Sequence, residues 1–303
     1  GLSVKVLENA SGDWIRVTRA PIPGSGEWTH QYGHPDNAAS SYDNLQGATR
    51  TDGLEVQWIG KPGPNAMVDR NPRPPAPLST RGRLFTQGLN RIITQDAYNG
   101  TILWTAEIPA LQRYNMPRDC GNWCADGDFL YTAVLNHAWR WDAASGNLTA
   151  VYEVPPPPEE EHGAYEWGYI ARAGDYLYGS AVRSGNFYTN FWGGSDEAWA
   201  DATSGPVTYK VCSDNLFAVN PGDGRLIWQY SQGVIINSTI TIAEGRVFFV
   251  ECRHPAVKAS SSRQVGLSEL WLNQYLVALD AETGRLEWER PVDTEGGIVV
   301  FYL

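Results

Sequence analysis

Cysteine is the residue type in this sequence with the widest range of chemistry. Cys120 and Cys124 lie four residues apart in the segment Cys-Gly-Asn-Trp-Cys, whereas Cys212 and Cys252 stand alone. The close pair could form a local disulfide or a reactive dithiol, or both side chains could be small, buried and apolar. None of the four belongs to a haem-attachment motif, which would end in histidine. The disulfide state of all four stays open at this stage.

Histidines and carboxylates suggest two further sites. His30 and His34 lie near Asp36 and Asp43, and imidazole with carboxylate could bind a metal ion. We expect no metal here, because the segment has the sequence of a loop and four-residue spacing aligns side chains only on a helix. Residues 155–162, four prolines followed by three glutamates and a histidine, could also bind cations. For this run we expect a stiff, solvated connector.

Motifs for nucleophilic catalysis and for phosphate binding are absent from the sequence. There is no nucleophile elbow, no Gly-rich phosphate loop and no order of Ser, His and Asp that assembles a triad. The formal net charge of −11 argues against the basic stripe that nucleic-acid binding requires. No apolar run is long enough for a membrane-spanning helix. We therefore expect no catalytic residue, no metal, no nucleic acid and no membrane insertion.

An aromatic-rich stretch is the best candidate for a binding surface. Ring faces with nearby carboxylates suit sugars, cationic groups or a protein partner. The competing interpretation is that these rings cover the core of the domain or pack on a neighbouring loop. The candidate residues are Phe187, Tyr188, Phe191, Trp192, Asp196, Glu197 and Trp199.

An internal repeat indicates the elements that must position these residues. Residues 278–288 read Ala-Leu-Asp-Ala-Glu-Thr-Gly-Arg-Leu-Glu-Trp, which is two strand-like pieces joined by a tight turn. Residues 218–228 and 94–104 repeat this pattern. A fourth copy begins at Asp142, and its tryptophan position is occupied by Ala150.

Each copy combines a turn with a large ring. Glycine supplies the positive φ of the turn, and the Asp or Asn four residues earlier can bind the turn backbone. The tryptophan is placed to pack against a neighbouring copy, and we expect it to be mostly buried there. The residues at these docking positions are Asp96, Gly100, Trp104, Asp142, Gly146, Asn220, Gly224, Trp228, Asp280, Gly284 and Trp288.

The repeat predicts an all-β fold, a β-propeller built from four-stranded antiparallel blades. We place whole blades at residues 75–109, 110–154, 155–232 and 233–292. The third and fourth carry insertions, residues 183–212 and 254–273, between their second and third strands. Equivalent connections emerge on one face, so we expect the two insertions to touch and to form the principal concave site. A disulfide between Cys212 and Cys252, which flank them, is conceivable.

The repeat resembles the tryptophan-docking motif of the quinoprotein propeller family, Ala-x-Asp-x-x-Thr-Gly-Lys-x-x-Trp. Residues 278–288 depart from it only by Arg285 in place of Lys, and the other copies are looser. The resemblance implies eight blades when the ring is complete, whereas this chain has about four to five. It implies a propeller over residues 28–303, incomplete at its C-terminal end. Residues 1–27 are then a lead-in from an upstream region.

The resemblance also implies two alternative functions. Catalytic members, the quinone-dependent alcohol dehydrogenases, stack pyrroloquinoline quinone on a disulfide between adjacent cysteines and hold calcium with Glu, Asn and Asp. This chain has no adjacent cysteine pair. We therefore expect a non-catalytic binding or scaffold domain without a cofactor, located outside the cytoplasm. Its partner is expected to be a protein or another domain of the same polypeptide, as for outer-membrane biogenesis propellers. The alternative is a dehydrogenase-like oxidoreductase that binds the quinone and calcium.

Overall fold

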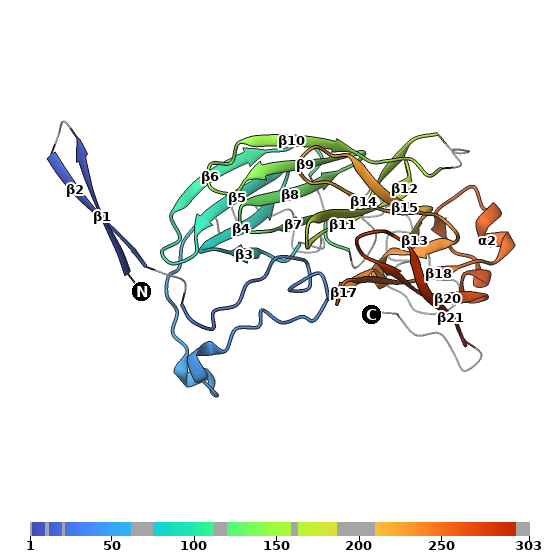
Figure 1. Cartoon of the computed structure of the whole chain (residues 1–303), viewed down its shortest axis with the longest axis horizontal. Helices are drawn as coiled ribbons and strands as arrows, with labels where there is room; N and C mark the ends of the chain where they lie inside the picture. Colours follow the sequence, from blue (N-terminus) through green and yellow to red (C-terminus); the bar gives the residue numbers. More distant parts are fainter. Residues whose placement is uncertain are drawn as a thin grey trace.

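Strands dominate the architecture, as the repeat predicts (Figure 1). The computed structural model describes residues 2–9, 12–19, 22–61, 75–111, 120–158, 163–186 and 210–294. Helical elements in these ranges are short and lie in connections: η1 (Leu45–Gly47), η2 (Thr51–Gly53), η5 (Asn237–Thr239), α2 (Pro255–Ala259) and η6 (Ser268–Trp271). In the described part of the chain, no helix is long and apolar enough to cross a membrane.

Two antiparallel meanders form the first half of the repeat region. In each, every strand pairs with its neighbours in sequence, so that short turns suffice to connect them. The first sheet contains β3 (Leu78–Thr80), β4 (Arg83–Gly88), β5 (Arg91–Asp96) and β6 (Ile102–Glu107). The second contains β7 (Trp123–Ala125), β8 (Phe129–Val134), β9 (His137–Asp142) and β10 (Leu148–Glu153). Both sheets fall inside the blade ranges predicted for them.

The third and fourth sheets keep this plan around their insertions. The third contains β11 (Tyr165–Ala173), β12 (Tyr176–Arg183), β14 (Asn215–Val219) and β15 (Leu226–Tyr230). The fourth contains β17 (Thr241–Ala243), β18 (Arg246–Cys252), β20 (Gln274–Asp280) and β21 (Leu286–Val292). Three further strands extend the fourth sheet: β13 (Lys210–Ser213) and β19 (Gln264–Val265), which belong to the insertions, and β16 (Val234–Ile236), which precedes β17.

The hydrophobic core lies between successive sheets. One buried cluster joins the first and second sheets, a second joins the second and third, and another joins the third and fourth. In the middle cluster, the rings of Trp167 and Phe217 meet edge to face at 5.0 Å. The second and third sheets are therefore apolar toward both of their neighbours, as stacked repeats require. The prediction of four-stranded antiparallel propeller blades is confirmed.

An exposed hairpin precedes the sheets. Its strands β1 (Leu2–Asn9) and β2 (Gly12–Arg19) pair antiparallel and project away from the rest of the chain (Figure 1). Val6 and Ile15 face each other across this ladder and are 57% and 69% exposed. The hairpin lies within residues 1–27, the predicted lead-in segment.

Candidate functional site

The repeat turns have the hydrogen bonds that the sequence predicts. Asp280 Oδ1 accepts from the hydroxyl of Thr283 at 2.7 Å and from its backbone N–H at 2.8 Å. These donors favour the charged carboxylate and lower the pKa of Asp280 below its ordinary value, the hydroxyl contributing most. Asp142 makes the same pair of hydrogen bonds with Ser145. Among the described hydrogen bonds, the side chains of Asp96 and Asn220 accept only from backbone N–H groups of their turns.

A tryptophan ring of one sheet packs against the turn glycine of the next sheet. Trp104 Nε1 donates to the carbonyl of Ala143 at 3.0 Å, and its ring lies so close to Gly146 that a Cβ there would approach within 2.6 Å. Trp228 makes the same contacts with the carbonyl of Ala281, at 2.9 Å, and with Gly284. Both glycines also have positive φ, so close approach and backbone conformation each require glycine.

Two more aromatic residues dock in the same way, and the sequence pattern missed both. Trp58 Nε1 donates to the carbonyl of Ala97 at 2.9 Å, and its ring lies against Gly100. Tyr152 donates its hydroxyl to the carbonyl of Pro221, and its ring lies against Gly224. Tyr152 lies two residues beyond Ala150 on β10, which puts it on the same face of the strand. The sequence signal that could have revealed Tyr152 was an aromatic residue two positions from Ala150, on the same face of the strand.

Trp288 departs from the expectation that it is buried. Its side chain is 37% exposed, whereas Trp228 is only 7% exposed. Trp288 lies on β21 and contacts the ring of Phe248, with 6.0 Å between ring centroids. No further glycine turn lies against Trp288 within the described ranges. Partial exposure follows, because a docking tryptophan is covered mainly by the turn of a following sheet.

Tyr152 allows a direct test of docking without tryptophan. Tyr152→Phe keeps the ring on Gly224 and removes the hydroxyl that donates to Pro221. We expect a loss of about 1 kcal/mol in the free energy of unfolding, measured by urea titration. Tyr98→Phe, at a side chain that is 48% exposed, is the control and should change it by less than about 0.5 kcal/mol. Equal losses in the two variants would contradict the docking role.

Residues 28–37, which we call the strap, run along the first strands of the sheets. The backbones of Trp28 and Ser79, a residue of β3, exchange two hydrogen bonds of 2.8 and 2.7 Å. The Thr29 carbonyl accepts from the N–H of Ala125, in β7, at 2.9 Å. The strap thus satisfies backbone groups on the inner edges of the first two sheets.

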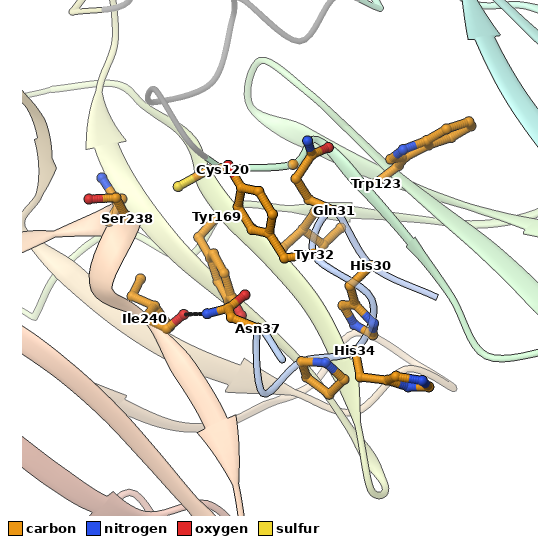
Figure 2. Close-up of a pocket in the computed structure, with 14 residues that line it drawn as sticks. His30, Gln31, Tyr32, His34, Asn37, Cys120, Trp123, Tyr169, Ser238 and Ile240 are labelled. Carbon is orange, nitrogen blue, oxygen red and sulfur yellow. Dashed lines mark hydrogen bonds between the residues drawn. The ribbon is translucent and has the colours of Figure 1, made fainter. Parts of the chain in front are cut away.

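The far end of the strap reaches the fourth sheet. The Pro35 carbonyl accepts from the N–H of Ile242, in β17, at 2.8 Å. Asn37 Nδ2 donates to the carbonyl of Ile240 at 3.0 Å (Figure 2). The same nitrogen also donates to Thr241 Oγ1 at 2.8 Å. A single ten-residue segment therefore bridges sheets that are far apart in the sequence.

His30 connects the strap to the third sheet. The N–H of Arg172, in β11, donates to His30 Nε2 at 3.0 Å, so Nε2 carries no proton and Nδ1–H faces Thr29 Oγ1 at 2.8 Å. Burial, and to a lesser extent the neighbouring His34, lower the pKa of His30 from 6.5 to about 3. The imidazole is neutral at physiological pH and serves as a structural hydrogen-bonding group rather than as a metal ligand.

The depressed pKa of His30 predicts acid sensitivity. The unfolded chain binds a proton near pH 6.5, whereas the folded chain binds it only near pH 3. The stability from the neutral ring is fully present above pH 6.5 and falls by about 1.4 kcal/mol per pH unit below it. His30→Gln keeps an acceptor for Arg172 and should remove this part of the dependence between pH 7.5 and 5. Parallel urea-derived stability curves for the two proteins would contradict the assignment.

A small pocket lies beside the strap. It encloses about 440 Å³, its open mouth included, between the strap and the sheets. Figure 2 shows Tyr32 and Asn37 of the strap beside Tyr169 of the third sheet. Burial raises the pKa of Tyr169 well above its ordinary value, so this phenol stays protonated. The pocket is lined mainly by polar and aromatic groups, including His30 and His34 of the strap.

The residues around the pocket do not fit calcium or the quinone that the quinone-dependent alcohol dehydrogenases bind. Calcium prefers carboxylate oxygens, and the described lining of the pocket includes no Asp or Glu. Among the residues that the structure describes, no group of three or more His, Cys, Asp or Glu side chains could hold a metal ion. Cys120 belongs to the lining, but no cysteine is adjacent to it in the sequence.

The cysteines have the character of buried structural residues. All four cysteine side chains are buried, and none of them forms a disulfide. Burial raises the pKa of Cys124 above its ordinary value and raises that of Cys212 to about 12. Cys252 is shifted in the same direction by burial. A raised pKa keeps these thiols protonated, and a protonated thiol is a poor nucleophile. The structure therefore favours buried apolar cysteines over a reactive pair. Cys212 and Cys252 share one hydrophobic cluster without forming a bond.

The two insertions meet, as predicted, on one side of the sheets. β13, at the end of the first insertion, pairs antiparallel with β19, in the second, with Lys210 opposite Val265 and Val211 opposite Gln264. Asn186, near the start of the first insertion, accepts from the N–H of Arg263 at 2.6 Å. We call this contact between the insertions the junction.

A buried ion cluster holds the junction together. Asp214 accepts from Arg183 Nε at 2.7 Å through one oxygen and from Arg263 Nε at 2.5 Å through the other. The side chains of these residues are at most 12% exposed. Two guanidinium groups share one carboxylate, and backbone carbonyls balance the remaining positive charge. Ser260, at the C-terminal cap of α2, accepts from both arginines.

The aromatic candidates lie outside the described residues. These are Phe187, Tyr188, Phe191, Trp192, Asp196, Glu197 and Trp199. The described ends of their insertion, β12 and β13, are fixed at the junction. Their role in binding stays a prediction, and so does the concave site.

Comparisons with known proteins give one family match and several similar solved structures. A family model described as outer membrane protein assembly factor BamB matches residues 197–301. A quinohemoprotein alcohol dehydrogenase from Pseudomonas putida HK5 is 11% identical with a TM-score of 0.48, over 88% of this chain and 40% of that chain. BamB from Moraxella catarrhalis is 12% identical with a TM-score of 0.34, over 74% of this chain and 62% of that chain.

A second quinohemoprotein alcohol dehydrogenase, from Comamonas testosteroni, is 13% identical with a TM-score of 0.44, over 71% of this chain and 34% of that chain. This chain spans less than two thirds of the length of each of these solved chains. No curated protein sequence matches it. The four-stranded sheets, the docking turns and the family match over residues 197–301 together show that the chain carries a β-propeller of the quinoprotein repeat type.

Proposed function

We propose that this propeller is a non-catalytic binding or scaffold domain that recognises a protein or a small ligand through loops on one face. The junction carries this proposal. The ladder between β13 and β19 joins insertions from two adjacent sheets into one continuous surface. A surface shared by two sheets and fixed by buried charges is preorganised for recognition.

Several observations favour this role over that of a dehydrogenase. The strap pocket has no Asp or Glu in its described lining, and His30 accepts a hydrogen bond from the N–H of Arg172. In the described contacts, the charged side chains pair with each other. Examples are the partially exposed pair Arg81–Asp128 and the buried cluster at Asp214. We therefore propose that the domain needs no cofactor. The family match to an outer membrane protein assembly factor supports a protein partner and a location outside the cytoplasm.

Site-specific photocrosslinking tests the binding face. A photoreactive phenylalanine analogue is placed at Trp192 in the natural full-length protein in its source cells, and the products are identified by mass spectrometry. We expect one dominant crosslinked protein or domain. The matched control carries the analogue at Tyr98, in the turn between β5 and β6. Because antiparallel strands alternate in direction, this turn emerges on the opposite face. Equal crosslinking from both positions would contradict the proposal.

Cofactor uptake distinguishes the alternative. The protein is incubated with pyrroloquinoline quinone and calcium, separated from free cofactor, and examined by absorbance and by alcohol-driven dye reduction. We expect neither retained quinone absorbance nor dye reduction. Stoichiometric uptake with turnover would overturn the non-catalytic assignment and favour the dehydrogenase.

A further inference from the structure

A gap separates the turns of the third and fourth sheets on the face opposite the junction. It encloses about 660 Å³, its open mouth included. Gly174 and Asp175, in the turn between β11 and β12, form one wall, and Glu244 and Gly245, between β17 and β18, form the other. These turns emerge opposite the insertions, because antiparallel strands alternate in direction. We call this space the third gap, since two equivalent gaps precede it along the sheets.

The third gap combines an apolar lining with acidic walls. Its buried apolar residues include Ile242, Tyr178 and Ala281. The carboxylates of Asp175, Glu244 and Glu282 line it as well, whereas no Lys or Arg does. In the described part of the chain, none of the three carboxylates makes an ion pair or accepts a hydrogen bond, and no group of side chains could hold a metal ion. This surface suits an organic cation with an apolar stem.

The equivalent gap between the first and second sheets is filled by an arginine of this chain. Arg81 occupies the turn between β3 and β4 at the position that Gly174 has between β11 and β12. Its guanidinium pairs with Asp128, in the first turn of the second sheet. It also lies so close to Gly127 that a Cβ there would be 2.7 Å from Arg81 Nε. A guanidinium therefore bridges the turns of these two sheets.

A second arginine fills the gap between the second and third sheets. Arg172 Nε donates to Asp126 Oδ2, in the first turn of the second sheet, at 3.1 Å. Its Nη1 donates to the carbonyl of Tyr176 at 3.1 Å and to that of Gly174. The first two gaps thus each hold a guanidinium against a turn carboxylate. The third gap has the carboxylates, but no guanidinium lines it.

We propose that the third gap binds an arginine side chain of a partner protein. The two other gaps of the same chain identify the group, because a guanidinium bridges the corresponding turns in both. Charge complementarity supports the same occupant, whose stem would lie on the apolar lining and whose cation would donate to the carboxylates. A free arginine molecule fits less well, because the acidic walls would repel its own carboxylate. This contact is separate from the proposed binding face and does not depend on it.

An NMR titration with a capped arginine tests this proposal. The isotope-labelled full chain is titrated with N-acetyl-arginine N-methylamide at low salt, and the amide resonances of Gly174 and Gly245 are followed. We expect saturable shifts. N-acetyl-citrulline N-methylamide has nearly the same shape without the charge and should bind at least roughly tenfold more weakly. Equal affinities of the two compounds, no saturable shift, or tighter binding of free arginine would overturn the proposal.

Filling the gap from within the chain should abolish the binding. Gly174→Arg copies Arg81, which has a φ of 45° where Gly174 has 52°. A Cβ at Gly174 would meet nothing within 4 Å, so the new side chain has room. We expect binding of the capped arginine to weaken at least roughly tenfold in this variant. Unchanged affinity would show that the compound binds elsewhere and would overturn the proposal.

Charge-matched variants locate the acidic walls. Glu244→Gln with Glu282→Gln removes two carboxylates from the third gap, and we expect at least roughly tenfold weaker binding. Glu8→Gln with Asp13→Asn removes two carboxylates that face each other in the exposed hairpin. Binding to this control should stay within about threefold of the parent, because its net charge changes equally but the gap is intact. Equal affinities of the two double variants would contradict the proposal.

Discussion

Asp214→Ala is expected to lower the free energy of unfolding by about 3 to 5 kcal/mol, measured by urea denaturation. The carboxylate of Asp214 lies between Arg183 and Arg263, whose side chains are 6% and 3% exposed. Removing it leaves two buried positive charges facing each other with only backbone carbonyls to balance them. Desolvated charges without a partner are among the most destabilising changes that a single substitution can make.

Asp128→Ala is the matched control for this prediction. Its carboxylate pairs with Arg81, but both side chains are more than half exposed. Water screens this pair, so its loss should change the stability by less than about 1 kcal/mol. Hydrogen exchange should also show that Asp214→Ala exposes the ladder between β13 and β19 before the other sheets. Comparable effects of the two substitutions would contradict the assignment of a buried cluster.

Trp228→Ala is expected to lower the free energy of unfolding by about 3 to 5 kcal/mol in the same measurement. The ring is 7% exposed, packs against Tyr178 with 6.0 Å between ring centroids, and lies on Gly284. Its Nε1–H donates to the carbonyl of Ala281. The substitution therefore creates a cavity between the third and fourth sheets and removes a buried hydrogen bond.

Trp288→Ala provides the comparison within the same repeat. This tryptophan occupies the equivalent position of the fourth sheet but is 37% exposed. Its truncation should change the stability by only about 1 kcal/mol. A loss as large as that of Trp228→Ala would show that a further turn covers Trp288 in solution.

The docking turns could be predicted from the sequence because the backbone restricts the residue type. A turn with positive φ that also lies against a ring, as at Gly146 and Gly284, accepts only glycine and leaves a mark in every copy. The residue type and position of the docking ring are less restricted than those of the glycine. Tyr152 takes the place of tryptophan from two residues farther along the strand, so a fixed spacing could not find it.

The strap and the ion cluster could not be predicted, since their contacts join residues that are distant in sequence. Asp214 lies 31 residues from Arg183 and 49 from Arg263, and no spacing rule connects them. The sequence did predict that the insertions would meet, because propeller symmetry places equivalent connections on one face. Symmetry could not indicate which side chains make the contact.

The strap also constrains how the chain can fold. Asn37 hydrogen-bonds to Ile240 across 203 residues, a contact of very high sequence separation. At the usual rate of protein synthesis, Ile240 leaves the ribosome about 10 to 40 s after Asn37. During this time the first two sheets can form, but the far end of the strap has no partner. Completion of the fold therefore waits for the fourth sheet, and the nascent chain keeps the polar groups of the strap in water until then.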